Sequence, residues 1–204
     1  MKEYIMEFIG AMFLVLAIAL TGNPFAIGIM LMAMVYIGGH ISGAHYNPAV
    51  TVSVWIRGKI KPNKIFGYMA AQVLGAIAAS YIFYILSGQT FLPSPGKGVP
   101  VFHSILIEAL FTFLLCSVIL AVATSKKLDG NYIYGLAIGL ALAAGAYAGG
   151  RISGGVYNPA VALGPMILKS LIEGYNFSNL IIYLIGPFAG AIIAAWAFKY
   201  LNPK

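Results

Sequence analysis

The sequence predicts an all-α membrane protein, with six transmembrane helices and two re-entrant half-helices that form an inverted repeat around a central pore. Three observations lead to this prediction. The composition is too apolar for a soluble domain, six apolar stretches are long enough to cross a bilayer, and one thirteen-residue segment occurs twice.

Composition places the chain in lipid. Of its 204 residues, 61% are hydrophobic and 8% are charged, whereas soluble domains average about 45–50% apolar and about 25% charged residues. A soluble domain of this length could not bury so much apolar surface, so the surplus must face lipid. The length fits one domain over residues 1–204.

Charge and cysteine content narrow the function classes. A net charge of +7 would suit a nucleic-acid binder, but the basic residues cluster between apolar segments and aromatic residues are not interleaved with them. No nucleic acid is therefore expected as a partner. The single cysteine, Cys116, lies in an apolar run, so we expect neither a disulfide framework nor a metal site. No cofactor is expected, and no nucleophile–base pair suggests an enzyme.

Six apolar stretches can each cross about 30 Å of hydrocarbon. They lie at roughly 4–21, 25–42, 64–87, 102–124, 132–150 and 178–201. Two shorter apolar pieces, 48–57 and 159–171, begin at an Asn-Pro pair, which favours a helix start because Asn caps and Pro fits the first turn. Each is too short to span, which predicts re-entrant half-helices that line a cavity or are buried in protein.

Charge placement predicts the orientation. Of the twelve Lys and Arg residues, nine fall on one side of this topology: Lys2, Arg57, Lys59, Lys61, Lys64, Lys126, Lys127, Lys199 and Lys204. Lys97, Arg151 and Lys169 fall on the other side. The positive-inside rule then places both termini in the cytoplasm. We expect a multi-pass protein of the cell membrane, with the lipid bilayer around it.

The internal repeat is the most informative feature. Residues 38–50 (GGHISGAHYNPAV) recur as residues 149–161 (GGRISGGVYNPAV), with ten of thirteen positions identical. The spans around them match too, since EFIGAMF at Glu7 aligns with EALFTF at Glu108. We place repeat one at about 3–87 and repeat two at about 102–201, joined by an external linker at about 88–101.

Each half contains three spans, an odd number, so the second half must be inserted upside down. Inverted repeats with broken helices that meet at the midplane indicate a solute pathway.

The paired Asn-Pro-Ala boxes, the segment GHISGAHYNPAVT before the third span, a Glu in the first and fourth spans and GPFAGAIIAA in the last span resemble the major intrinsic proteins, the aquaporins and aquaglyceroporins. The resemblance covers roughly residues 3–200. It implies a passive channel for water and small uncharged solutes such as glycerol, assembled as a homotetramer with one pore per subunit.

The resemblance assigns two pore boxes, formed by Asn47, Pro48, Ala49, Asn158, Pro159 and Ala160. The two Asn amides would orient a passing oxygen, while the positive helix ends would oppose protons and cations. The segments before the boxes are expected to run extended and to line the pore with the carbonyls of Gly43, Ala44, His45, Gly154 and Val156.

Two glutamates and two histidines lie within the two repeats, close to the predicted pore. Carboxylates in membrane spans are costly and are usually functional or paired; by resemblance, Glu7 and Glu108 brace the two half-helix loops. His40 is interpreted as a buried imidazole that fixes the first loop. The His45 side chain is interpreted as a loop anchor, with a pH gate as the alternative.

The chain departs from the family at the external filter. Most members carry an Arg directly after the second box, where this chain has Val161. The family spacing places Gly155, Ala146 and Ile27 at the other filter positions. Such a filter would be wide and apolar with no fixed charge, which favours glycerol, urea, ammonia, hydrogen peroxide or a dissolved gas over strict water selectivity.

Arg151 is expected near the external pore mouth, because it aligns with His40 of the first copy. It either replaces part of the missing filter charge or snorkels into the vestibule. Two alternatives to a passive channel remain: a closed or gated structural membrane protein, and a coupled secondary transporter, which also uses inverted repeats.

Overall fold

The computed structural model describes residues 1–202; Lys204, one of the basic residues assigned to the cytoplasmic side, lies outside the described residues. Within that range, six helices are long and apolar enough to cross a membrane. They are α1 (Lys2–Thr21), α2 (Pro24–Ser42), α4 (Ile65–Ser87), α5 (Val101–Thr124), α6 (Tyr134–Ser153) and α8 (Leu180–Leu201). The predicted spans match these bounds within three residues.

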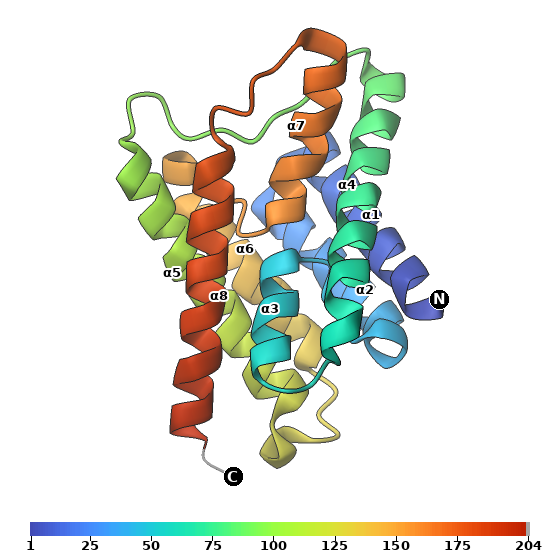
Figure 1. The fold of residues 1–204 in the computed structure, drawn as a ribbon, viewed down its shortest axis with the longest axis vertical. Helices are drawn as coiled ribbons and strands as arrows, with labels where there is room; N and C mark the ends of the chain where they lie inside the picture. Colours follow the sequence, from blue (N-terminus) through green and yellow to red (C-terminus); the bar gives the residue numbers. More distant parts are fainter. Residues whose placement is uncertain (203–204) are drawn as a thin grey trace.

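Two shorter helices, α3 (Pro48–Ile56) and α7 (Pro159–Glu173), complete the architecture. Each begins at the proline of an Asn-Pro pair, as the sequence predicts. In Figure 1, α3 occupies the lower half of the bundle and α7 the upper half, with the longer helices around them. This arrangement confirms the predicted fold class of six transmembrane helices and two half-helices.

Helix pairs from the two halves of the chain pack in matching ways. α1 packs against α4 and α5 packs against α8, while α2 lies against α6 across the two halves. The α2–α6 contact is close because each helix presents a glycine to the other. A Cβ added to Gly28 would lie 2.5 Å from the carbonyl oxygen of Gly139, and one added to Gly139 would lie 2.4 Å from that of Gly28.

The two ends of the bundle differ in their connections. One end, called the loop end here, carries the turn between α1 and α2, the segment 88–100 between α4 and α5, and the connection between α7 and α8. Lys169 Nζ at this end lies 2.6 Å from Glu173 Oε2 and 3.0 Å from Thr90 Oγ1, and Thr90 also donates to Glu173. These contacts attach the 88–100 segment to the last turn of α7.

The outer surface of the bundle is apolar. Large side chains such as Phe66 (83% exposed) and Leu171 (79% exposed) point away from the core. A soluble protein would seldom leave so many large apolar groups uncovered, whereas a bilayer accepts them.

Candidate functional site

The two half-helices meet at their N-termini near the centre of the bundle. Asn47 caps α3 and Asn158 caps α7: Asn47 Oδ1 accepts from Ala49 N at 2.9 Å, and Asn158 Oδ1 accepts from Ala160 N at 3.0 Å. Both caps have extended backbone conformations, and a proline follows each. The positive ends of both helix dipoles therefore face the same central region.

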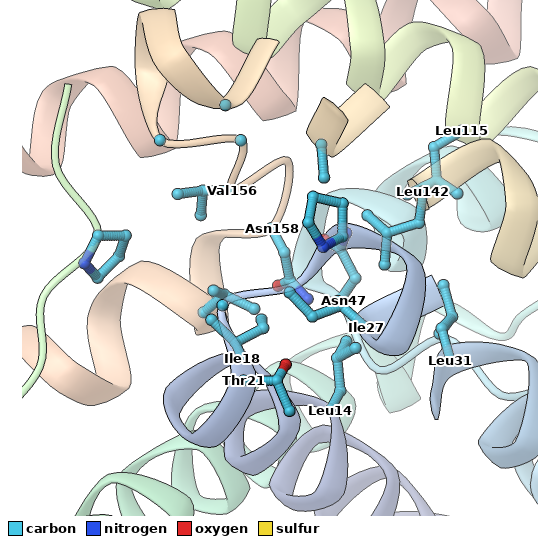
Figure 2. Close-up of a pocket in the computed structure, with 18 of the residues that line it drawn as sticks. Leu14, Ile18, Thr21, Ile27, Leu31, Asn47, Leu115, Leu142, Val156 and Asn158 are labelled. Atoms are coloured by element: carbon cyan, nitrogen blue, oxygen red, sulfur yellow. The ribbon is translucent and has the colours of Figure 1, made fainter. Parts of the chain in front are cut away.

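The two asparagines also join the halves to one another. Asn47 Nδ2 donates to the carbonyl oxygen of Tyr157 at 2.8 Å, and Asn158 Nδ2 donates to that of Tyr46 at 2.9 Å. A side-chain amide has two N–H donors, so each asparagine retains one that these contacts do not use. Figure 2 shows the two amides close together in the middle of a cavity.

Glu7 of α1 binds the loop before α3 with both carboxylate oxygens. Its Oε1 accepts from Ser42 Oγ at 2.6 Å and from His45 N at 2.9 Å. Its Oε2 accepts from Tyr46 N and from Gln72 Nε2, each at 2.7 Å. The carboxylate is fully buried, and these four donors offset the cost of removing it from water.

Glu108 of α5 makes the matching contacts in the second half. Its Oε1 accepts from Ser153 Oγ at 2.6 Å and from Val156 N at 3.0 Å, and its Oε2 accepts from Tyr157 N at 2.5 Å. It has no counterpart of the Gln72 contact, because Pro187 occupies the matching position of α8. Both carboxylates therefore hold their loops, one with four donors and the other with three.

The loops before the boxes do not run extended, and that prediction is wrong. Gly43, Ala44 and Tyr46 have φ values of +87°, +53° and +51°, and Gly154 and Tyr157 have φ values of +96° and +49°. The left-handed turns aim successive N–H groups at one carboxylate, which an extended strand could not do because its N–H groups alternate in direction. The energetic cost of positive φ at Ala44 and the tyrosines is offset by these charged hydrogen bonds.

Some contributors to this site carry little signal in the sequence. Tyr46 and Tyr157 anchor the loops through their hydroxyls, which donate at 2.8 Å to the carbonyls of Met34 and Gly145. Because both tyrosines lie at identical positions of the repeat, the repeat could have pointed to them. Gln72 has no such partner, so only its position in space identifies it.

A cavity of about 650 Å³ runs past the two asparagines to the loop end. Its wall is mostly apolar and comes from α1, α2, α5 and α6 (Figure 2). Four pairs of identical residues at matching repeat positions contribute to it: Leu14 and Leu115, Ile18 and Ile119, Ile27 and Ile138, and Leu31 and Leu142. Both halves thus present similar apolar surfaces to the cavity.

The predicted site residues gather around this cavity. Its lining includes Asn47, Asn158, Ala44, His45, Gly154, Val156 and the four predicted filter residues Ile27, Ala146, Gly155 and Val161. The lining residues do not include Gly43, whose left-handed conformation ends α2. Pro48, Ala49, Pro159 and Ala160 are also absent from the lining residues, and they form the buried first turns of the half-helices.

Arg151 lies in the last turn of α6 and lines the cavity at the loop end, and Leu92 and Pro93 of the 88–100 segment line the same cavity. Its side chain is exposed, and among residues 1–202 it forms no ion pair. Within residues 1–202, the ion pair found at this end joins Lys169 to Glu173. The cavity mouth therefore carries a positive charge that no described carboxylate neutralises.

The two histidines of the first loop differ in environment. His45 is buried and its Nδ1 lies 3.1 Å from Thr51 Oγ1, a contact that is consistent with an anchoring role. His40 is exposed in the last turn of α2, so the expectation of a buried imidazole is wrong. Cys116 is buried and free, and no cluster within residues 1–202 has three or more side chains suited to a metal ion.

Comparisons with known proteins agree with this geometry. Residues 1–198 match the major intrinsic protein (MIP) family. The chain is 36% identical over 188 residues to aquaporin NIP1-4 of Oryza sativa subsp. japonica, which covers 91% of this chain and 67% of that protein. It is 35% identical to aquaporin AqpM of Methanothermobacter thermautotrophicus, in an alignment that covers 100% of this chain and 98% of that protein.

Among solved structures, the fold resembles the aquaglyceroporin from Plasmodium falciparum, with a TM-score of 0.88, 24% identity and coverage of 99% and 97% of the two chains. A more distant likeness, with a TM-score of 0.60 and 14% identity, relates it to an FNT family ion channel and covers 98% of this chain and 90% of the other.

Proposed function

Because the chain belongs to the major intrinsic protein family, we propose that it is a passive transmembrane channel for water and small uncharged solutes. The observation that carries this proposal is the cavity at whose centre two half-helix N-termini and two asparagine amides meet. An amide donor can bind a passing oxygen, and the helix dipoles disfavour cations at the same point. The apolar wall keeps solute binding weak enough for release.

Ile27, Ala146, Gly155 and Val161 form the selectivity filter in this proposal. With Val161 in place of the usual Arg, the filter has no fixed charge and no side-chain donor. Gly155 and Ala146 contribute little bulk, because Gly155 has no side chain and Ala146 has only a methyl group. Such a filter favours uncharged solutes larger or less polar than water, with glycerol, urea, ammonia and hydrogen peroxide as candidates.

The remaining site residues have supporting roles. Glu7 and Glu108 brace the loops, and the carbonyls of Ala44, His45, Gly154 and Val156 face the solute. Arg151 repels cations at the mouth. Its exposed guanidinium and the lack of an ion-pair partner among the described residues support this role.

The membrane arrangement follows from charge and resemblance. We place the loop end outside the cell and both termini in the cytoplasm of a cell-membrane protein, because the loop end carries fewer basic residues. A homotetramer with one pore per subunit is part of the same proposal. The exposed apolar faces of the long helices would then contact lipid or neighbouring subunits.

Stopped-flow light scattering on proteoliposomes tests the proposal. We expect osmotic water efflux and glycerol or urea entry to exceed the rates of protein-free vesicles. Fast water with slow solute entry would contradict the wide filter while retaining a channel. Rates equal to those of protein-free vesicles for all three would contradict the channel and favour a closed, structural protein.

A further inference from the structure

We propose that the pore selects uncharged solutes that donate more hydrogen bonds than they accept, with ammonia and urea as the smallest examples. This inference rests on the proposed channel function and narrows its substrate class. It follows from the supply of donors and acceptors along the cavity, which is strongly unequal.

The backbone N–H groups of both loops bond within the protein. Ala44 N donates to Ser42 Oγ at 3.0 Å, and the N–H groups of His45 and Tyr46 donate to Glu7. In the second loop, Gly155 N donates to Ser153 Oγ at 3.1 Å. The N–H groups of Val156 and Tyr157 donate to Glu108. The serines and carboxylates thus turn the donors of both loops away from the cavity.

The carbonyl groups of the same residues have no such partners. Within residues 1–202, no hydrogen bond reaches the carbonyl oxygens of Ala44, His45, Gly154, Gly155 or Val156, and all five residues line the cavity. The neighbouring carbonyls of Tyr46 and Tyr157 are already used by the two asparagines. A solute on this path therefore meets a series of free acceptors.

Side chains add few donors in the inner part of the cavity. Asn47 and Asn158 each retain one N–H. The His45 ring adds none in its neutral form. The Thr51 hydroxyl donates to Asn47 O, so His45 Nδ1 must donate to Thr51, which leaves Nε2 without a proton.

The residue at the filter position increases the excess of hydrogen-bond acceptors over donors along the cavity. Val161 is buried and lines the cavity, and it supplies no donor where an Arg would supply five. Arg151 and Tyr147 do offer donors, but both are exposed at the mouth, where water competes for them. A solute that mainly accepts hydrogen bonds gives up the water molecules that donate to it and finds few donors in the pore. A solute rich in N–H groups finds the free carbonyl acceptors of the two loops.

The test compares urea with acetamide, which have nearly the same shape and differ by an NH₂ group in place of CH₃. Acetamide is the more lipophilic, so an apolar pore without polar selection would pass it faster. A net hydrogen bond is worth about 0.5–1.5 kcal/mol, which corresponds to about two- to tenfold in rate. We expect urea to enter faster than acetamide by about that factor, after the protein-free vesicle rate is subtracted.

Two variants of matched shape test the cause. Val161→Asn and Val161→Leu introduce side chains with the same heavy-atom branching, but only asparagine adds N–H donors. We expect both to slow entry, Val161→Leu to keep the urea-to-acetamide ratio, and Val161→Asn to lower that ratio several-fold. A ratio that changes equally in the two variants would overturn the proposed cause.

The outcomes separate the inference from the channel function. Water and glycerol entry above protein-free vesicles, with acetamide as fast as urea or faster, would overturn the donor preference and leave the channel intact. No entry of any solute would overturn both. The wild-type ratio needs no variant, so the inference remains falsifiable even if Val161→Asn fails to insert.

Discussion

Asn47 donates a hydrogen bond to the carbonyl oxygen of Tyr157 at 2.8 Å, which joins the first half-helix to the loop of the second. The reciprocal bond from Asn158 to Tyr46 completes the pair. Each asparagine therefore caps its own helix, fixes the opposite loop and still presents one N–H. These combined tasks make the amide itself, and not merely a capping oxygen, the requirement at these positions.

Replacement of that amide should change ion exclusion. Asn47→Asp keeps the capping oxygen for Ala49 N but loses the donor to Tyr157 and adds negative charge at the pore centre. We expect a cation leak larger than that of the wild type, measured as conductance in planar bilayers. The matched control is Asn23→Asp, which makes the same change at the exposed cap of α2, where Asn23 accepts from Phe25 N at 2.9 Å. Equal leaks in both variants would contradict the prediction.

The two braces should differ in their sensitivity to amide substitution. In Glu108→Gln the amide nitrogen can take the place of Oε2, which accepts from a single donor, so one hydrogen bond is lost. In Glu7→Gln each carboxylate oxygen accepts from two donors, so the amide nitrogen faces two donors whichever oxygen it replaces. We expect Glu7→Gln to lose more free energy of unfolding by about one charged hydrogen bond, or about 1.5–3 kcal/mol. SDS titration in mixed micelles measures it. Equal losses would show that Gln72 adds nothing.

The packing of the Tyr46 ring should tolerate no extra methyl group at Gly10. A Cβ there would lie 2.0 Å from Tyr46 Cε1, and such overpacking costs about 1–3 kcal/mol. We expect Gly10→Ala to unfold more easily in the same titration. Gly150→Ala is the control, because among the described residues no atom outside its own stretch of helix lies within 4 Å of its added Cβ. A stable Gly10→Ala protein would mean that Tyr46 can move without cost.

The contacts at the loop end should respond to acid. Hydrogen bonds from Lys169 and then from Thr90 hold the pKa of Glu173 below its usual 4.5. The attachment of the 88–100 segment is therefore complete above pH 4.5 and is lost as the pH falls through the lowered pKa. We expect lower hydrogen-exchange protection factors, that is, exchange faster relative to the intrinsic rate at the same pH, in residues 88–95 at low pH, and in Glu173→Gln already at neutral pH. Glu3→Gln, which breaks the Lys64 pair at the other end, should leave this exchange unchanged.

The mouth charge should matter most at low salt. Because Arg151 is exposed, its field is screened over a Debye length of about 8 Å at physiological ionic strength. We expect Arg151→Ala to raise cation leak a few-fold at low ionic strength and less at high salt, with solute entry unchanged. Lys97→Ala, a change of the same charge on the 88–100 segment outside this cavity, is the control. A cation leak of Arg151→Ala that is the same at low and high ionic strength would exclude an electrostatic role for Arg151.

Much of the fold was predictable because its signals are local. An Asn-Pro pair fixes where a helix starts, whatever surrounds it, so α3 and α7 begin where expected. The apolar spans were found within three residues, since their length reflects the bilayer and not a neighbouring helix. The repeat also aligns Glu7 with Glu108 from the sequence alone.

The path of the loops was not predictable from local signals. Glycine permits many backbone conformations, so Gly43 and Gly154 were compatible both with the extended path that we expected and with the left-handed turns that the structure has. The left-handed turns at Ala44, Tyr46 and Tyr157 are stable only because a carboxylate from another helix gathers their N–H groups. The exposure of His40 was also not predictable, because it depends on where the last turn of α2 lies in the tertiary structure.

The sequence by itself determined the spans, the half-helix starts and the repeat, because these follow from composition, capping chemistry and self-similarity along the chain. Only the tertiary structure decided which donors are used and which acceptors remain free at the cavity. That division depends on contacts between residues far apart in the chain, such as Gln72 with Glu7 and Asn47 with Tyr157. Hydrogen-bond partners are fixed by position in space, which no local pattern records.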